Sequence, residues 1–96
     1  MYARLIKMNL GPNDRAVAES LADAATKLYR ASPGFKSISF IVNEPAGEYG
    51  SFSVWESKEA IEAASAKVQP LIKEKVGALL ENPPAVTAWE VYEPKV

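Results

Sequence analysis

Hydrophobic and polar residues alternate along four stretches of the chain and recur at helical spacing along two others. A period of two is typical of a strand with one buried face, and a period of three to four is typical of an amphipathic helix. The alternation predicts strands over residues 2–10, 35–43, 49–56 and 86–93. The helical spacing predicts one helix between Asp14 and Ser32 and a second that begins after Ser57.

The two predicted helices differ in continuity. Asn13 or Asp14 is expected to cap the first helix and Ser57 the second, because their side-chain oxygens accept bonds from free backbone N–H groups. Pro70 lies inside the second apolar pattern, so we expect a kink or break there, followed by a further helical segment that reaches Leu80. The apolar stripe of the first helix consists of Val17, Leu21, Ala24, Ala25 and Leu28.

The order of these elements defines the fold class. The turn Glu44–Glu48 is short, so strands 35–43 and 49–56 are expected to form an antiparallel hairpin. The whole order is β-α-β-β-α-β, the ferredoxin-like α+β arrangement, with a four-stranded antiparallel sheet and helices on one face. Ninety-six residues suit one such domain over residues 1–96.

Composition excludes several classes of protein. The formal net charge is −1 and basic residues are scattered, which disfavours a nucleic-acid partner or an anionic membrane surface. The chain contains no cysteine and no histidine, so we expect no disulfide, no thiolate chemistry and no metal site. Arg4 and Lys7 interrupt what would be the apolar part of a signal peptide, and no apolar run reaches the ~20 residues of a membrane span. We therefore expect a cytoplasmic protein without a membrane partner.

Neither face of the predicted hairpin carries the charges typical of a solvated sheet. Simple alternation places Ile38, Phe40, Val42, Phe52 and Val54 on one face. It places Ser37, Ser39, Ile41, Ser51, Ser53 and Trp55 on the other. Because helices cover only one side of such a sheet, a second copy of the chain is expected to cover the other side as a homodimer.

The stretches "SPGFKSISF" and "SFSVWESKEAIEAA", with the proline-interrupted helix and the last strand, resemble the antibiotic biosynthesis monooxygenase-like domains of the dimeric α+β barrel superfamily. The resemblance implies a homodimeric barrel with a pocket between sheet and helices in each subunit. Some members oxidise polycyclic phenols or quinols without metal or flavin, and others degrade haem with a histidine ligand. This chain has no histidine, so the resemblance implies no haem and no other cofactor.

The resemblance also implies a set of ligand-binding residues. Trp55 matches the tryptophan that lines the family pocket, and Asn9 loosely matches an asparagine on the first strand. With the small residues beside Trp55, the predicted ligand-binding set is Trp55, Ser53, Ser51, Ser39, Asn9 and Tyr29. Core packing of Trp55 is the alternative, with Leu28 and Tyr29 filling the space beside the serines. Trp89 is expected in the core or at a dimer interface.

Candidate chemistry beyond this set is sparse. Arg4 and Lys7 point to opposite faces of their strand, so at most one of them faces a pocket, where a cation would stabilise a phenolate. The alternative for both is a solvated or ion-paired surface charge. No general base is evident, although Tyr29 or Tyr49 could serve or the substrate could ionise in solution, and the catalytic residues are not identified.

Three functions are consistent with these patterns. The first is a cofactor-independent monooxygenase acting on a small aromatic or quinol-type compound. The second is a non-catalytic protein that binds a small hydrophobic ligand, and the third is a dimeric interaction module whose pocket is filled by side chains. A cavity of a few hundred cubic ångströms beside Trp55 would favour the first two.

Overall fold

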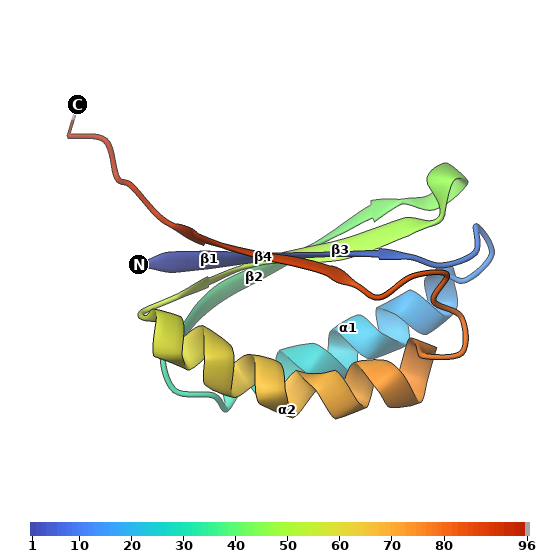
Figure 1. The fold of residues 1–96 in the computed structure, drawn as a ribbon, viewed down its shortest axis with the longest axis horizontal. Helices are drawn as coiled ribbons and strands as arrows, with labels where there is room; N and C mark the ends of the chain where they lie inside the picture. Colours follow the sequence, from blue (N-terminus) through green and yellow to red (C-terminus); the bar gives the residue numbers. More distant parts are fainter. Residues whose placement is uncertain (96) are drawn as a thin grey trace.

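The chain folds into two layers, with a four-stranded sheet on one side and two helices on the other (Figure 1). The computed structural model of the protein describes residues 1–95. Along the chain the elements are β1 (Tyr2–Asn9), α1 (Arg15–Arg30), β2 (Phe35–Asn43), the 3-10 turn η1 (Glu44–Ala46), β3 (Glu48–Trp55), α2 (Lys58–Val76) and β4 (Ala85–Glu90). The predicted β-α-β-β-α-β order, with both helices on one face, is confirmed.

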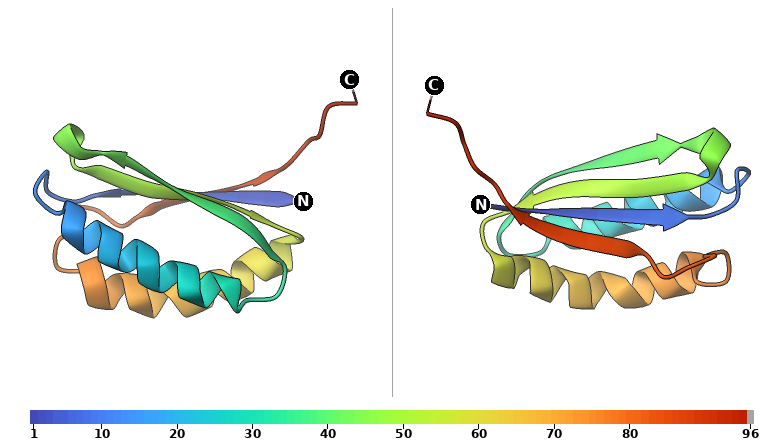
Figure 2. Two further views of the ribbon diagram at one scale, coloured as in Figure 1. Left: turned by 180° about the vertical axis from the view of Figure 1, so that it is seen from behind. Right: turned by 45° about the horizontal axis from the view of Figure 1, so that its top comes forward.

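The strands lie in the order β2-β3-β1-β4, and every neighbouring pair is antiparallel. β4 is an edge strand that pairs only with β1, and β2 is the edge strand on the opposite side. The helices follow this division, since α1 lies on the β2 side of the sheet and α2 on the β4 side (Figure 2). The space next to α2 is therefore bounded by an edge strand.

Two clusters of buried side chains fill the space between the layers. The first contains Ala25, Tyr29, Trp55, Ile61, Ala64 and Val68. The second contains Leu10, Leu21, Tyr49 and Val76. Trp55 is fully buried at 0% exposure, and its indole Nε1 donates a 2.8 Å hydrogen bond to Ser53 Oγ. Trp55 is therefore packed in the core, which was the alternative to a position in a pocket wall.

A bulge at the start of β2 decides which side chains face the helices. Phe35 pairs with Trp55, but the next pair is Ser37 with Val54, so Lys36 is an extra residue in β2. Because side chains alternate between faces, one extra residue moves every later side chain of the strand to the opposite face. The face assignment predicted from simple alternation is therefore wrong for the hairpin.

The corrected register places large side chains of β2 beside small ones of β3. Across the hairpin Ile38 pairs with Ser53, Phe40 with Ser51 and Val42 with Tyr49, on the face that meets the helices. Ser39 pairs with Phe52 on the open face, so its predicted grouping with Ser51, Ser53 and Trp55 is wrong.

Helix α2 runs through Pro70 as one helix, so of the predicted kink or break the break is wrong. Val68 before the proline and Val76 after it are both buried, each in a different core cluster. Packing on both sides therefore holds the helical path, although proline cannot donate the bond that the carbonyl of Ala66 would accept. Ala66 and Pro70 are both exposed residues of α2.

Several element ends and one helix cap differ from the predicted ones. Ser57 caps α2 as predicted, its Oγ accepting from Ala60 N at 3.1 Å. Asp14 stands at the start of α1 but accepts instead from Gly11 N at 2.8 Å. The helix α2 ends at Val76 rather than near Leu80, and β4 ends at Glu90.

The second face of the sheet is not covered by a helix. It carries Ile41, Phe52 and Trp89, which are 45%, 44% and 56% exposed. The chain therefore leaves an apolar sheet face open, as the sequence predicted, and Trp89 lies outside its core. None of the helices within residues 1–95 is long and apolar enough to cross a membrane.

Two serines test the corrected register. Ser53→Ala leaves the buried indole N–H of Trp55 without an acceptor, so we expect the free energy of unfolding to fall by ~1–3 kcal/mol. Ser39→Ala, on the exposed face of the same hairpin, should change it by less than ~0.5 kcal/mol. Urea denaturation followed by circular dichroism measures both values. Equal losses in the two variants would contradict the bulged register.

Candidate functional site

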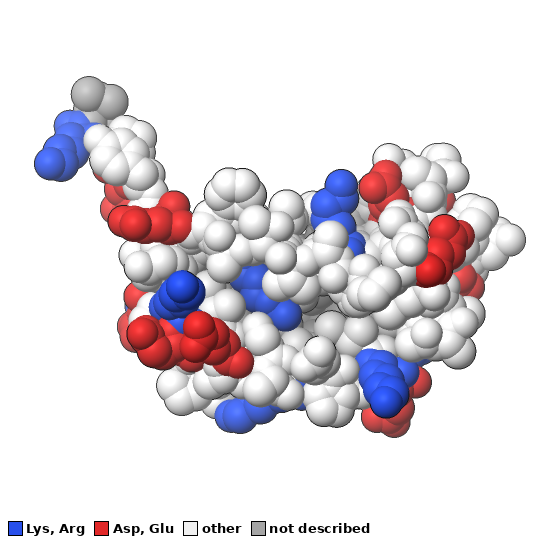
Figure 3. All heavy atoms as spheres, in the orientation of Figure 1, with Lys and Arg blue, Asp and Glu red and all other residues white. Residues whose placement is uncertain are grey.

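A groove of about 810 Å³ runs between β4 and the C-terminal half of α2. Its walls come from one side of α2, from the segment of residues 77–84 and from Val86 of β4, and Arg4 of β1 lies at its base. Figure 3 shows this face, where atoms of basic residues lie in the middle of a mostly uncharged surface. The volume is within the range of small-molecule sites, ~300–1,000 Å³.

Arg4 reaches this position because its neighbours in the sheet are small. It lies between Ser53 of β3 and Ala88 of β4, and this leaves room for a long side chain over the helix-facing surface. The side chain is buried at 4% exposure, and its Nη1 donates a 2.9 Å hydrogen bond to the hydroxyl of Tyr29. The guanidinium is thus fixed between the sheet and the last turn of α1.

The charge of Arg4 has no carboxylate partner among residues 1–95. Its buried Nε also has no hydrogen-bond partner within this part of the chain. Buried polar atoms without a partner are rare, and an unpaired buried charge is costly. No acidic side chain is among the described residues that line the groove, whereas Lys73 adds a second cation. The groove therefore suits an anion with an apolar body.

An aromatic cluster stands behind the Arg4–Tyr29 contact. The Tyr29 ring meets Trp55 edge-to-face at 5.4 Å between centroids, and Phe35 meets Trp55 in the same manner at 5.2 Å. Gly34, just before Phe35, has a φ of 81°, and a Cβ there would lie 2.7 Å from Ala60 Cβ, so glycine allows the turn to pack closely on α2. Trp55 therefore contacts Tyr29, which accepts a hydrogen bond from Arg4, and does not itself line the groove.

The structure brings together only part of the predicted ligand-binding set. Trp55, Ser53, Ser51 and Tyr29 lie on the helix-facing side of the sheet or against it, and all four are buried. Tyr29 occupies the space beside Trp55, as the packing alternative proposed. The two remaining members, Ser39 and Asn9, are exposed and point away from the helices.

The space directly between the sheet and α1 is much smaller than the groove. It measures about 40 Å³ and is bordered by Ile6, Tyr29, Phe40 and Ser51, among others. Such a space holds a few water molecules at ~10–15 Å³ of accessible volume each. The groove at the β4 edge therefore has room for an aromatic ligand, whereas the space between the sheet and α1 does not.

The expectation that at most one of Arg4 and Lys7 faces inward is confirmed. Lys7 lies on the open side, where its exposed ammonium pairs with Glu48 at 3.6 Å. The surface-charge alternative therefore describes Lys7 and not Arg4. The α2 wall of the groove was missed by the sequence reading, although Ala66, Gln69, Pro70 and Lys73 share one helix face by their spacing of three and four.

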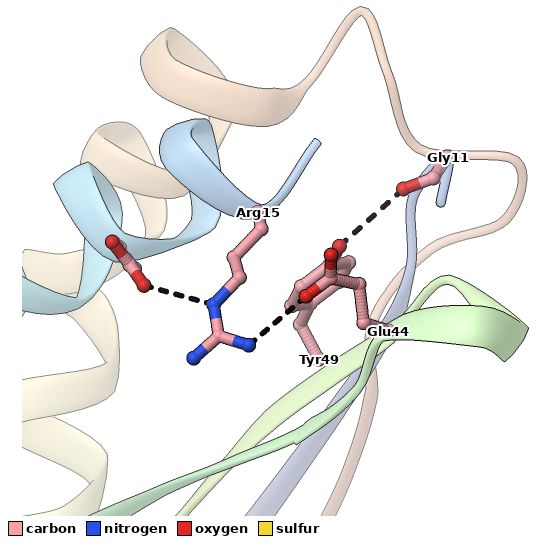
Figure 4. A network of polar contacts seen from close by, with 5 residues as sticks. Gly11, Arg15, Glu44 and Tyr49 are labelled. Atoms are coloured by element: carbon pink, nitrogen blue, oxygen red, sulfur yellow. Dashed lines mark hydrogen bonds and ion pairs between the residues drawn. The ribbon is translucent and has the colours of Figure 1, made fainter. Parts of the chain in front are cut away.

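A second polar cluster joins α1 to η1 (Figure 4). Arg15 pairs with Glu19 at 3.0 Å and with Glu44 at 2.9 Å, and these contacts raise its pKa, with the Glu44 hydrogen bond the largest cause. The Tyr49 hydroxyl donates a long 3.5 Å bond to the Gly11 carbonyl. Each charge of this exposed cluster already has a partner, so it connects elements and offers no reactive group.

Neither tyrosine named as a possible base is suited to that role. Burial raises the pKa of Tyr29 above its usual 10, and the nearby Arg4 guanidinium offsets only part of that effect. Burial raises the pKa of Tyr49 as well, and the carboxylates of Glu44 and Asp14 add to it. Both hydroxyls are protonated at neutral pH. Across residues 1–95 no three acidic, histidine or cysteine side chains gather as a metal site would require.

Comparison with known proteins places the fold. The solved structure of Rv0793 from Mycobacterium tuberculosis has a TM-score of 0.79 at 24% identity, covering 99% of this chain and 98% of that one. For the NE2512 protein of unknown function from Nitrosomonas europaea the TM-score is 0.81 at 18% identity, with 99% and 92% covered. SnoaB, a cofactor-independent oxygenase from Streptomyces nogalater, gives 0.76 at 16% identity, with 98% and 95% covered.

No curated protein matches the chain. The family model for antibiotic biosynthesis monooxygenases matches residues 1–70, from β1 to the middle of α2. Residues 71–86, which supply much of the groove wall, lie beyond the matched part. Because the match spans well over half of the 96 residues, the protein belongs to the antibiotic biosynthesis monooxygenase family.

Proposed function

We propose that the protein binds a small aromatic, quinol-type compound as its anion in the groove and catalyses oxygenation of that compound without a cofactor. The observation that carries this proposal is the buried guanidinium of Arg4, which borders the groove and has no carboxylate partner within residues 1–95. Family membership and the structural likeness to SnoaB, a cofactor-independent oxygenase, support it.

The chemistry needs an electron-rich anion and molecular oxygen. A deprotonated anthrone-type substrate transfers one electron to O₂, and the resulting radical pair recombines with formation of a C–O bond. The peroxide takes up the proton that the substrate released and then loses water across the C–H and O–O bonds, which leaves a carbonyl group. In total, CH₂ and O₂ become C=O and H₂O, and the substrate carbon supplies all the electrons.

The protein contributes electrostatics and placement to this reaction. The cationic guanidinium of Arg4 stabilises the substrate anion, and its bond to Tyr29 holds the guanidinium in place before the substrate arrives. Leu80 and Val86 offer apolar contacts for the ring. Because Tyr29 is protonated at neutral pH, the substrate proton passes to water, and Arg4 favours that loss by stabilising the anion.

We propose a homodimer as the working form. The support is the open face of the sheet, where Ile41, Phe52 and Trp89 remain exposed in a single chain. Sheet-to-sheet association buries such a face and leaves the groove accessible, because the groove lies on the helix side.

Non-catalytic ligand binding is the second candidate function. It is favoured by the two buried tyrosines, since neither is poised to remove a proton. Binding of a quinol-type anion without oxygen uptake would support this candidate over the oxygenase.

Substitution of Arg4 tests whether its positive charge is needed for oxygenation. Arg4→Met is expected to slow oxygen uptake with an anthrone or naphthoquinol by ~10²–10³-fold, because it removes the donor to the developing anion. Lys7→Met is the matched control: it removes a cation of the same strand from the opposite face, and the rate should stay within about twofold. Oxygen-electrode assays measure both rates. Equal rates in the Arg4 variant and the wild type would contradict the proposal.

The free energy of unfolding tests whether Arg4 serves the fold or the ligand site. Replacement of a buried ion pair by apolar side chains of similar volume is often neutral or stabilising, by up to ~4 kcal/mol, and Arg4 lacks even a carboxylate partner among residues 1–95. The double variant Arg4→Met, Tyr29→Phe removes the unpaired charge together with its hydrogen-bond partner. We therefore expect its free energy of unfolding to exceed that of the wild type while its activity is lost. A less stable double variant would show that Arg4 serves the fold.

The pH dependence of kcat/KM tests whether Tyr29 removes the substrate proton. The raised pKa of Tyr29 keeps its hydroxyl protonated below about pH 10. The value of kcat/KM should therefore rise with pH to a plateau set by the substrate's own pKa. Two substrates of different acidity should reach their plateaus at different pH values, and Tyr29→Phe should leave the shape unchanged. A single pKa common to both substrates and lost in Tyr29→Phe would identify Tyr29 as the base.

A further inference from the structure

Pro70 lies in the middle of α2 at a point where the helix wall meets the groove. A proline has no N–H, so the carbonyl of Ala66, four residues earlier, lacks its usual helical donor. Ala66 and Pro70 both line the groove and both are exposed. On this wall the Ala66 carbonyl therefore lacks the i+4 donor that any residue other than proline would supply.

The proline is costly where it stands. A proline inside a helix is less favourable than alanine by ~3 kcal/mol. Here it neither ends α2 nor separates it into two helices, because the helix continues to Val76. The missing donor to the Ala66 carbonyl is a local change that the proline makes on the groove wall.

The base and the α2 wall of the groove thus offer different hydrogen-bonding groups to a ligand. Arg4 at the base has only donors and is unpaired by any carboxylate of residues 1–95. The Ala66 carbonyl on the α2 wall has only acceptor capacity. Between and beside them lie apolar side chains, including Val68, Ile72 and Val86. A flat apolar body with an anionic oxygen and a separate hydroxyl satisfies both.

We propose that Pro70 determines specificity by keeping the Ala66 carbonyl open, so that the groove selects aromatic compounds with two oxygen substituents. One oxygen, as the anion, pairs with Arg4, and a second hydroxyl donates to the Ala66 carbonyl. This rests on the proposed function only in taking the groove as the binding site. A compound with a single oxygen leaves the carbonyl without a donor and binds more weakly.

Binding is tested with probes that do not react with oxygen. In 6-hydroxy-2-naphthoate the carboxylate stands for the substrate anion and the hydroxyl for the second oxygen, whereas 6-methoxy-2-naphthoate lacks the donor. Isothermal titration calorimetry of the wild type is expected to show ~5–10-fold tighter binding of the hydroxy acid, the effect of one hydrogen bond.

The Pro70→Ala variant gives the decisive comparison. Its new N–H occupies the Ala66 carbonyl, so affinity for the hydroxy acid should fall to that of the methoxy acid, which itself should be unchanged. The melting temperature should rise, which separates loss of recognition from loss of folding. Pro33→Ala, in the turn before β2 and outside the groove, is the matched control and should keep the preference. Gln69→Ala removes the neighbouring side-chain acceptor on the same wall but leaves the Ala66 carbonyl unchanged, so this variant should also keep the preference.

Each outcome has a separate meaning. Equal binding of the two acids by the wild type, or an undiminished preference in Pro70→Ala, overturns the role of Pro70 and leaves the oxygenase proposal standing. A preference that depends on Pro70, without oxygen uptake on any quinol, upholds the role of Pro70 and overturns the oxygenase. Failure of both acids to bind, together with unchanged oxygen uptake in Arg4→Met, overturns the groove as the site of either process.

Discussion

Arg4, a positive charge held inside the fold with no carboxylate partner among residues 1–95, is the constraint on which the candidate site depends. Arg4 extends over small neighbours on β3 and β4 and ends on the hydroxyl of Tyr29. Tyr29 in turn lies against Trp55, which is fixed by Ser53. The buried aromatic cluster therefore determines where the guanidinium stands, and the groove beside α2 is where its unpaired charge has access to a ligand.

The fold could be predicted from the sequence because its elements have clear periods and clear boundaries. The apolar stripe of α1, the cap at Ser57 and the short turn after Asn43 each depend on neighbouring residues only. The faces of the hairpin could not be predicted in the same way. A single extra residue, Lys36, moves the later side chains of β2 to the opposite face. The pattern of charges does not reveal this shift, because both registers leave a hairpin face without charged side chains. The error at Ser39 follows directly from that residue.

The candidate site was predictable only in part. Alternation along β1 correctly separates Arg4 from Lys7, but the burial of Arg4 depends on Ala88, Tyr29 and α2, which are distant in sequence. For the same reason Trp55 could not be assigned to core or pocket before the position of Tyr29 was known. The break expected at Pro70 is overridden because α2 packs into two clusters, one on each side of the proline.

The two tryptophans of the chain lie on opposite surfaces of one sheet, Trp55 under the helices and Trp89 on the open side. The indole of Trp55 is therefore buried, whereas that of Trp89 is exposed to solvent. A chain in which only one of them remains would carry an optical reporter for a single side of the sheet. Light emission could then distinguish an event transmitted through the aromatic cluster from the approach of another molecule to the bare surface.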